Sequence, residues 1–144
     1  MVLFLPRDAA SVPVSRQVLD GCLATLGVTP DTRNDLALAL SEACANAIQH
    51  SSRGEEYEVT ASARDGRCVI EVVNTGPVPA MPEATPPVPP TAEHGRGLKI
   101  IDAVVDNMQL TSDEGHGTTV HFEKTLQWVP GAPGEHLFSA EVSS

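Results

Sequence analysis

Glu42, Asn46 and His50 follow one another at intervals of four residues in the stretch from Leu36 to Ser52. On a helix of about 3.6 residues per turn these side chains form one stripe, each roughly one turn above the last. A carboxylate next to an amide oxygen suits a hard, oxygen-seeking cation, or a proton acceptor beside one. The plainer interpretation is a solvated polar face, which is common on amphipathic helices.

The same stretch has an apolar side that would bury it against a core. That side consists of Leu36, Leu40, Ala43, Cys44, Ala47 and Ile48. The small side chains of Ala39 and Ala43 leave space beside Glu42 for a ligand to approach its carboxylate. The pattern therefore predicts a helix that holds a polar stripe at the surface of a folded domain.

Length and composition exclude several classes of protein. With 144 residues, 41% of them apolar, the chain is most simply one domain with a proper core. A net charge of −10 and an aromatic content of 3% argue against nucleic-acid binding, which needs cations and stacking platforms. No apolar run approaches the roughly 20 residues of a membrane span, and the first ten residues do not resemble a signal peptide. We therefore expect a cytoplasmic protein with no membrane partner.

The cysteines and histidines do not indicate a metal or disulfide framework. Cys22, Cys44 and Cys68 include no C-x-x-C pair, and each falls on an apolar position of an expected helix or strand. We interpret them as small core residues. The five histidines lack zinc-like spacing.

Apolar periodicity predicts strands and helices in a regular order. An edge strand covers Val2 to Leu5, a helix with Ser11 as its N-cap runs to Gly27, and a second helix starts at Thr29 and ends before Arg53. Two hairpins and a third helix follow: strands at 57–64 and 68–73 around Asp65-Gly66, a helix opening at 95–97, and strands at 108–111 and 118–126.

A long aperiodic segment separates the first hairpin from the third helix. The stretch from Gly76 to Gly95 contains seven prolines and almost no charge. Such a loop inside a compact domain is usually a functional lid or a disordered insert. After Trp128 the chain is rich in Pro and Gly, and we expect a tail that is mobile or docked against a neighbour through Trp128, Leu137 and Phe138.

Four short motifs occur in a fixed order along these elements. They are E-A-C-A-N on a helix, V-V-N-T-G-P after a strand, H-G-R-G-L-K-I-I opening a helix, and G-T-T-V-H-F on the last strand. In this order they resemble the GHKL superfamily, the ATP-binding fold of histidine kinases, gyrase-type ATPases and Hsp90. More closely, they resemble the anti-sigma-factor serine protein kinases, and the resemblance covers roughly residues 3 to 125.

The resemblance implies an α+β fold: a two-layer sandwich of the Bergerat type, with a mostly antiparallel sheet and helices on one face. The expected order of elements fits this fold. Residues 1–126 would form the ATP-binding domain, with the Pro-rich ATP lid at about 77–94. Residues 127–144 would be a flexible or docking tail.

The resemblance also implies catalytic and metal-binding roles. Glu42 corresponds to the base that takes the proton from an attacking hydroxyl. Asn46 corresponds to the residue that binds Mg²⁺ between the nucleotide phosphates. His50 matches a position often occupied by histidine in this branch, and capping or packing is an equal alternative there.

Further residues correspond to the family's nucleotide-binding positions. Asn74 and Gly76 fall at the adenine pocket, and Thr118 corresponds to the last-strand residue that closes it. The G-R-G-L motif would meet the phosphates through backbone amides at a helix start, and it comprises Gly95, Arg96, Gly97 and Leu98. Plain helix entry, a hairpin turn and, for Arg96, a solvated position remain as structural alternatives.

Asn74 departs from the family, which usually has Asp at this position. An amide can still accept a hydrogen bond from the adenine amino group, but it lacks the charge that strengthens such bonds. We therefore expect nucleotide affinity or base selectivity to differ from that of the family.

The function implied by the resemblance is that of an anti-sigma factor and serine kinase. Such a protein binds ATP and Mg²⁺ and phosphorylates a serine of an anti-anti-sigma (STAS-domain) protein, so that a sigma factor is released or sequestered by partner switching. A homodimer is compatible with this reading. The alternative is a catalytically weak or inactive module of the same fold that sequesters a regulatory partner.

Overall fold

The computed structural model describes residues 1–49, 56–74, 92–113 and 117–138. Within these ranges the chain forms, in order, β1 (Val2–Pro6), α1 (Ser11–Leu26), α2 (Pro30–Gln49), β2 (Glu56–Arg64), β3 (Arg67–Asn74), α3 (Ala92–Val104), β4 (Asn107–Asp113), β5 (Gly117–Thr125) and α4 (Pro133–Phe138).

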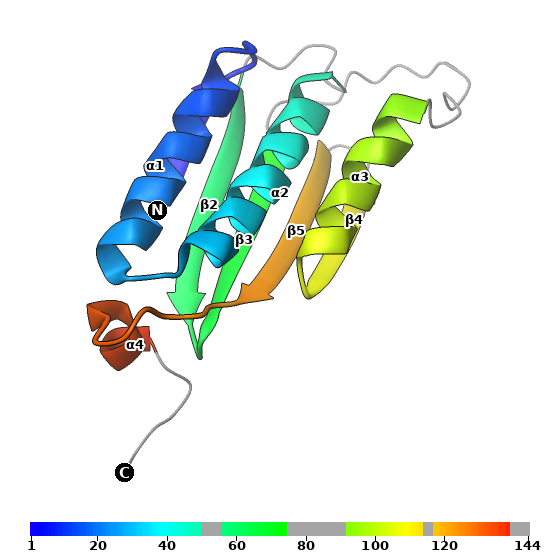
Figure 1. Ribbon diagram of the computed structural model, residues 1–144. Helices are drawn as coiled ribbons and strands as arrows, with labels where there is room; N and C mark the ends of the chain where they lie inside the picture. The colour runs from blue at the N-terminus through cyan, green and yellow to red at the C-terminus, as the bar shows by residue number, and fades with distance from the viewer. Residues whose placement is uncertain (50–55, 75–91, 114–116, 139–144) are drawn as a thin grey trace, which may run out of the picture.

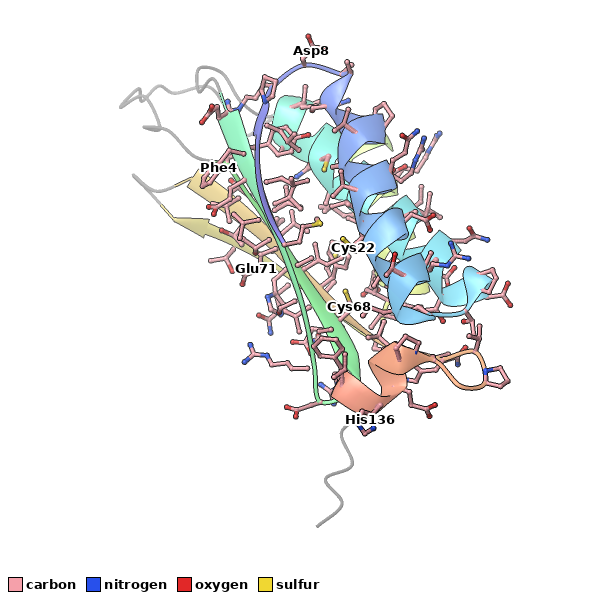
Figure 2. All side chains as sticks on the ribbon, turned by 90° about the vertical axis from the view of Figure 1, so that its left-hand side faces the viewer. Phe4, Asp8, Cys22, Cys68, Glu71 and His136 are labelled. Atoms are coloured by element: carbon pink, nitrogen blue, oxygen red, sulfur yellow. The ribbon has the colours of Figure 1, made fainter. Side chains whose placement is uncertain are left out.

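The strands form one five-stranded sheet in the order β1-β2-β3-β5-β4, and every neighbouring pair is antiparallel. Helices α1, α2 and α3 lie side by side over one face of this sheet (Figure 1). We call the other side, which no helix covers in the described chain, the open face (Figure 2). The predicted α+β two-layer fold, with helices on one face and β1 at a sheet edge, is confirmed.

Alternation along the central strands explains why the helices cover only one face. In β3, the residues Cys68, Ile70 and Val72 are buried, while those between them are only half-buried. Side chains of a strand point alternately to its two faces, so the buried row faces the helices. Figure 2 shows Cys68 on the helix side and Glu71 on the open face.

Local signals set several boundaries correctly. Gly27 ends α1 with φ of 91°, the left-handed conformation that glycine adopts without strain. Asp65 and Gly66 have φ of 52° and 76°, as the tight turn between β2 and β3 requires.

Ser11 is not the N-cap that the sequence predicts. It is the first residue of α1, Ala10 precedes it without a side-chain cap, and the Ser11 hydroxyl shares a hydrogen bond of 2.5 Å with the buried Tyr57 hydroxyl. A buried hydroxyl needs a partner, and the partner of Tyr57 is supplied by Ser11.

Helix α3 begins earlier than the sequence predicts. It starts at Ala92, so Gly95 and Gly97 lie within its first two turns and do not open it. Ala92 and Glu93 are both good helix formers, so intrinsic propensity supports the additional turn.

The cysteines divide into two buried residues and one exposed residue. Cys44 and Cys68 are in the core, and burial raises the pKa of both thiols, that of Cys68 to about 12. Cys22 is exposed, so its predicted core position is wrong. It lies on the outer side of α1, where the apolar pattern continues beyond the buried stripe.

The segment after β5 packs on the chain's own domain. Trp128 forms a bridge with Val28, and the Cα of Gly134 approaches Trp128 and Leu26 so closely that no Cβ would fit there. The Gly66 amide donates to the Phe138 carbonyl over 2.6 Å. The short helix α4, which the sequence pattern did not predict, therefore closes one end of the molecule. Among the described helices, none has the length and apolar character needed to cross a membrane.

Candidate functional site

The predicted site residues gather at the end of the molecule opposite α4. The second half of α2, the end of β3 and the start of α3 all lie there (Figure 1). Helix α2 packs against both α3 and β3. His50, Gly76 and nearly all of the predicted lid fall outside the described residues.

Glu42 on α2 lies against Gly97 on α3. A Cβ built on Gly97 would be 3.1 Å from Glu42 Oε1, which is tighter than ordinary van der Waals contact. Glu42 is half-buried, and no residue of the described ranges donates a hydrogen bond to its carboxylate. The glycine therefore leaves room for this carboxylate between two helices and leaves its oxygens available.

Asn46 follows Glu42 on the same side of α2, about 6 Å farther along the helix axis at 1.5 Å per residue. It is also half-buried, and none of the described side chains bonds its amide. The expected pair of a carboxylate and an amide oxygen, one turn apart and both available, is therefore present in the structure.

Asn74 is the last residue of β3, and its side chain continues the buried row on the helix side of the sheet. It is 8% exposed, and its Oδ1 atom is buried without a hydrogen-bond partner among the described residues. Leaving a buried amide oxygen unsatisfied costs roughly 1–3 kcal/mol. Such a group in a native fold calls for an explanation, for which a bound ligand is one candidate.

The register of the sheet places Thr118 next to Asn74. In the β3–β5 register Val73 pairs with Thr119, so extending it by one residue places Asn74 opposite Thr118. Thr118 is half-buried and lies in the same row as the buried Val120, on the helix side. Two of the three residues predicted at the adenine pocket, Asn74 and Thr118, thus come together, although 44 positions separate them in the chain.

The remaining residues of the G-R-G-L motif differ in exposure. Arg96 is exposed on α3, and Leu98 packs partly against the core. Gly95 lies in the first turn of α3. The structure brings the motif beside α2, with Gly97 as the position of close approach.

These residues fit a magnesium nucleotide. The described residues contain no cluster of three or more His, Cys, Asp or Glu that could hold a metal alone. Mg²⁺ is commonly bound through one or two protein oxygens together with substrate phosphates, which suits an isolated Asn46. The unpartnered Oδ1 of Asn74 offers an acceptor to a base amino group.

A second polar cluster lies on the open face and was missed at the sequence level. His121 Nδ1 is 2.9 Å from Glu71, and His121 Nε2 is 2.9 Å from Glu123, which also pairs with Arg67 at 3.2 Å. The alternation in V-H-F-E already places His121 and Glu123 on one face, but only the β3–β5 register brings Glu71 beside them.

Opposing effects set the protonation of this cluster. Burial lowers the pKa of His121, but its bonds to Glu123 and Glu71 and their negative charges outweigh burial and raise it above its ordinary value. The bond from His121 lowers the pKa of Glu123, against the opposing effect of burial. Because both ring nitrogens face carboxylates, the imidazolium form satisfies both bonds.

Comparisons with known proteins agree on one family. A family model described as a histidine kinase-like ATPase domain matches residues 5–124. The serine-protein kinase RsbW of Bacillus mycoides is 28% identical over 134 residues, covering 85% of this chain and 82% of the relative. RsbW of Bacillus velezensis is 29% identical over 136 residues with the same coverage.

A solved structure is similar in fold. The crystal structure of the RsbU and RsbW domains of a Mycobacterium tuberculosis protein matches with a TM-score of 0.67 and 22% identity. The match covers 88% of this chain and 32% of that one.

Proposed function

Because the chain belongs to the histidine kinase-like ATPase domain family, we propose that it is a serine protein kinase and anti-sigma factor that uses Mg²⁺-ATP. The observation that carries the proposal is the available carboxylate of Glu42, held beside Gly97. The RsbW relatives, named as serine-protein kinases, support the choice of acceptor residue.

Glu42 is proposed to accept the proton of the acceptor serine. A general base must have a free oxygen within reach of the hydroxyl, and no described residue occupies the carboxylate oxygens of Glu42. Gly97 keeps the space beside that carboxylate open. Bound Mg²⁺-ATP would supply the phosphoryl group, and the Mg²⁺ would neutralise much of the charge on the phosphates.

Asn46 is proposed to hold the cation through its side-chain oxygen, one turn from Glu42. Asn74 and Thr118 would hold the base, and the phosphates would lie toward Gly95, Arg96 and Gly97 in the first two turns of α3. Phosphoryl transfer depends mainly on positioning and charge neutralisation, so this division of tasks is sufficient for catalysis. His50 and Gly76 keep their sequence-based assignments as part of the same site.

The proposed protein substrate is a serine of a STAS-domain antagonist, and the proposed second partner is a sigma factor. Both follow from the similarity to RsbW kinases. Competition of these partners for one surface would couple phosphorylation to release of the sigma factor.

A phosphorylation assay tests the proposal directly. The purified chain is incubated with Mg²⁺, labelled ATP and the STAS proteins encoded in the same genome, each beside a variant with the acceptor Ser replaced by Ala. Label on one native antagonist, absent from its Ala variant, is the expected result. If no antagonist is labelled although the chain binds both nucleotide and partner, the chain is a sequestering module and not a kinase.

A further inference from the structure

Asn74 occupies a position where the fold would otherwise place an apolar side chain. The three preceding members of its row, Cys68, Ile70 and Val72, are all buried and apolar. The residue opposite Asn74 on β2 is Tyr57, which is fully buried. An amide in this row contributes nothing to the core that a valine would not contribute better.

The Tyr57 hydroxyl does not satisfy the amide. It is bonded to Ser11, and Asn74 Oδ1 has no partner among the described residues. The amide is more than nine-tenths buried, so water reaches it poorly in the folded chain. A ligand that hydrogen-bonds this oxygen would recover the penalty that folding incurs here.

The chemistry of an amide decides which ligand group fits. The six-position of adenine carries an amino group, which donates, whereas guanine carries a carbonyl there, which accepts. A carboxylate only accepts, so it favours adenine and repels guanine. A primary amide presents an acceptor through Oδ1 and, after a half-turn about its last torsion, a donor through Nδ2.

We propose that Asn74 reads the six-position of the purine base and that, as a neutral amide, it lets this chain bind guanine nucleotides almost as well as adenine nucleotides. The proposal rests on the proposed nucleotide-binding function and adds which substrates the site accepts. Thr118, opposite Asn74 in the extended register, would lie close to the same bound base.

Titration calorimetry with Mg²⁺-ATP and Mg²⁺-GTP on the whole chain and on Asn74→Asp tests this specificity. The wild-type protein should bind both nucleotides within roughly tenfold of each other, the difference of one neutral hydrogen bond. Asn74→Asp should tighten ATP roughly tenfold, because charged hydrogen bonds are about twice as strong, and should weaken GTP. Asn34→Asp, the same change at an exposed position of α2, should leave the ratio unaltered.

Purine riboside triphosphate, which lacks any group at the six-position, provides a second measurement. In the wild-type protein it should bind more weakly than ATP, and in Asn74→Ala the two should bind equally. This comparison holds even if the buried carboxylate introduced by Asn74→Asp prevents that variant from folding.

The outcomes separate this inference from the proposed function. If the wild-type chain binds neither ATP nor GTP, the proposed function is wrong. If it binds ATP but Asn74→Asp leaves the ATP-to-GTP ratio unchanged, or Asn74→Ala still distinguishes ATP from purine riboside triphosphate, Asn74 does not contact the six-position and the inference is overturned.

Discussion

On the open face of the sheet, His121 has both ring nitrogens bonded to carboxylates, and Glu123 has a further bond from Arg67. On the helix side, the Oδ1 of Asn74 is buried and unbonded. The carboxylate of Glu42 lies beside Gly97 and accepts no hydrogen bond from a described residue. The sheet lies between these two groups of polar side chains (Figure 1). Satisfied polar networks rigidify a fold, whereas unsatisfied ones cost stability and are retained where a ligand completes them. The first group is therefore expected to serve stability and the second to serve binding and catalysis.

The largest expected effect comes from Glu42→Gln. Loss of a general base typically lowers the rate of the chemical step by roughly 10²–10⁴-fold. Nucleotide affinity should change little, because a base acts on the attacking hydroxyl. Calorimetry and phosphate transfer on the same preparation measure both quantities. Equal losses of affinity and rate would make Glu42 a structural residue or a metal ligand.

Asn46→Ala should weaken Mg²⁺-nucleotide binding by roughly tenfold to a hundredfold, the range for removing one hydrogen-bonding or coordinating partner of a charged group. Binding of metal-free nucleotide in EDTA should change much less. The measurement is a pair of titrations, with and without Mg²⁺. An identical loss in both would remove Asn46 from the metal site.

Gly97→Ala should lower the rate of phosphate transfer with little effect on the stability of the fold. Its new Cβ would meet Glu42 Oε1 at 3.1 Å, and the flexible carboxylate can move away at little cost to folding. Because small displacements of a reacting group are expensive for catalysis, transfer should fall roughly tenfold.

The matched control is Gly21→Ala in α1, where an added Cβ meets nothing within 4 Å. It should stabilise the fold by up to about 1 kcal/mol through helix propensity and leave transfer unchanged. Thermal unfolding and phosphate-transfer rates, measured for both variants, show whether the added methyl group affects catalysis or stability. A Gly97→Ala protein with full transfer activity would show that the space beside Glu42 is not needed.

The smallest expected effect belongs to the open face. His121→Gln should destabilise the fold by roughly 1 kcal/mol, the scale of partly exposed ion pairs. Since the folded-state pKa of His121 is raised, its contribution is complete below the unfolded value of about 6.5 and is lost as the pH rises through the folded value. The lowered pKa of Glu123 makes its own contribution disappear in acid.

Denaturant unfolding at pH 6 and pH 9 measures this dependence. The wild-type and His121→Gln proteins should differ more at pH 6 than at pH 9, while His136→Gln, an exposed change on α4, should follow the wild type at both. A difference that grows with pH would contradict the charged cluster. Loss of nucleotide binding in His121→Gln would contradict the division between the two faces.

The sequence predicts features that local backbone chemistry determines. Gly27 ends α1 and Asp65-Gly66 forms its turn because only certain residues adopt positive φ. The alternation of β2 and β3 likewise determines the helix-covered face.

Features that depend on residues far away in the sequence could not be predicted in this way. The hydroxyl of Ser11 bonds Tyr57, 46 residues away, and so is not available as a cap. The packing of α3 against α2 likewise joins segments that are far apart in the sequence. The approach of Gly97 to Glu42 and the isolation of Asn74 Oδ1 become visible only when α2, α3 and β3 are in place.

The pairing of β3 with β5 has a consequence for the order of folding. Strands β2 and β3 join through a two-residue turn, and β4 and β5 through a short connection, but β3 meets β5 across more than forty residues of intervening chain. Loop-closure entropy must be overcome before such a non-local contact gives any stabilisation, so this pairing is expected to form late. Asn74 and Thr118 become neighbours only at that step. A nucleotide bound by both residues would hold β3 and β5 together. It would stabilise the folded chain by roughly 2.7 kcal/mol when its concentration is a hundred times its dissociation constant.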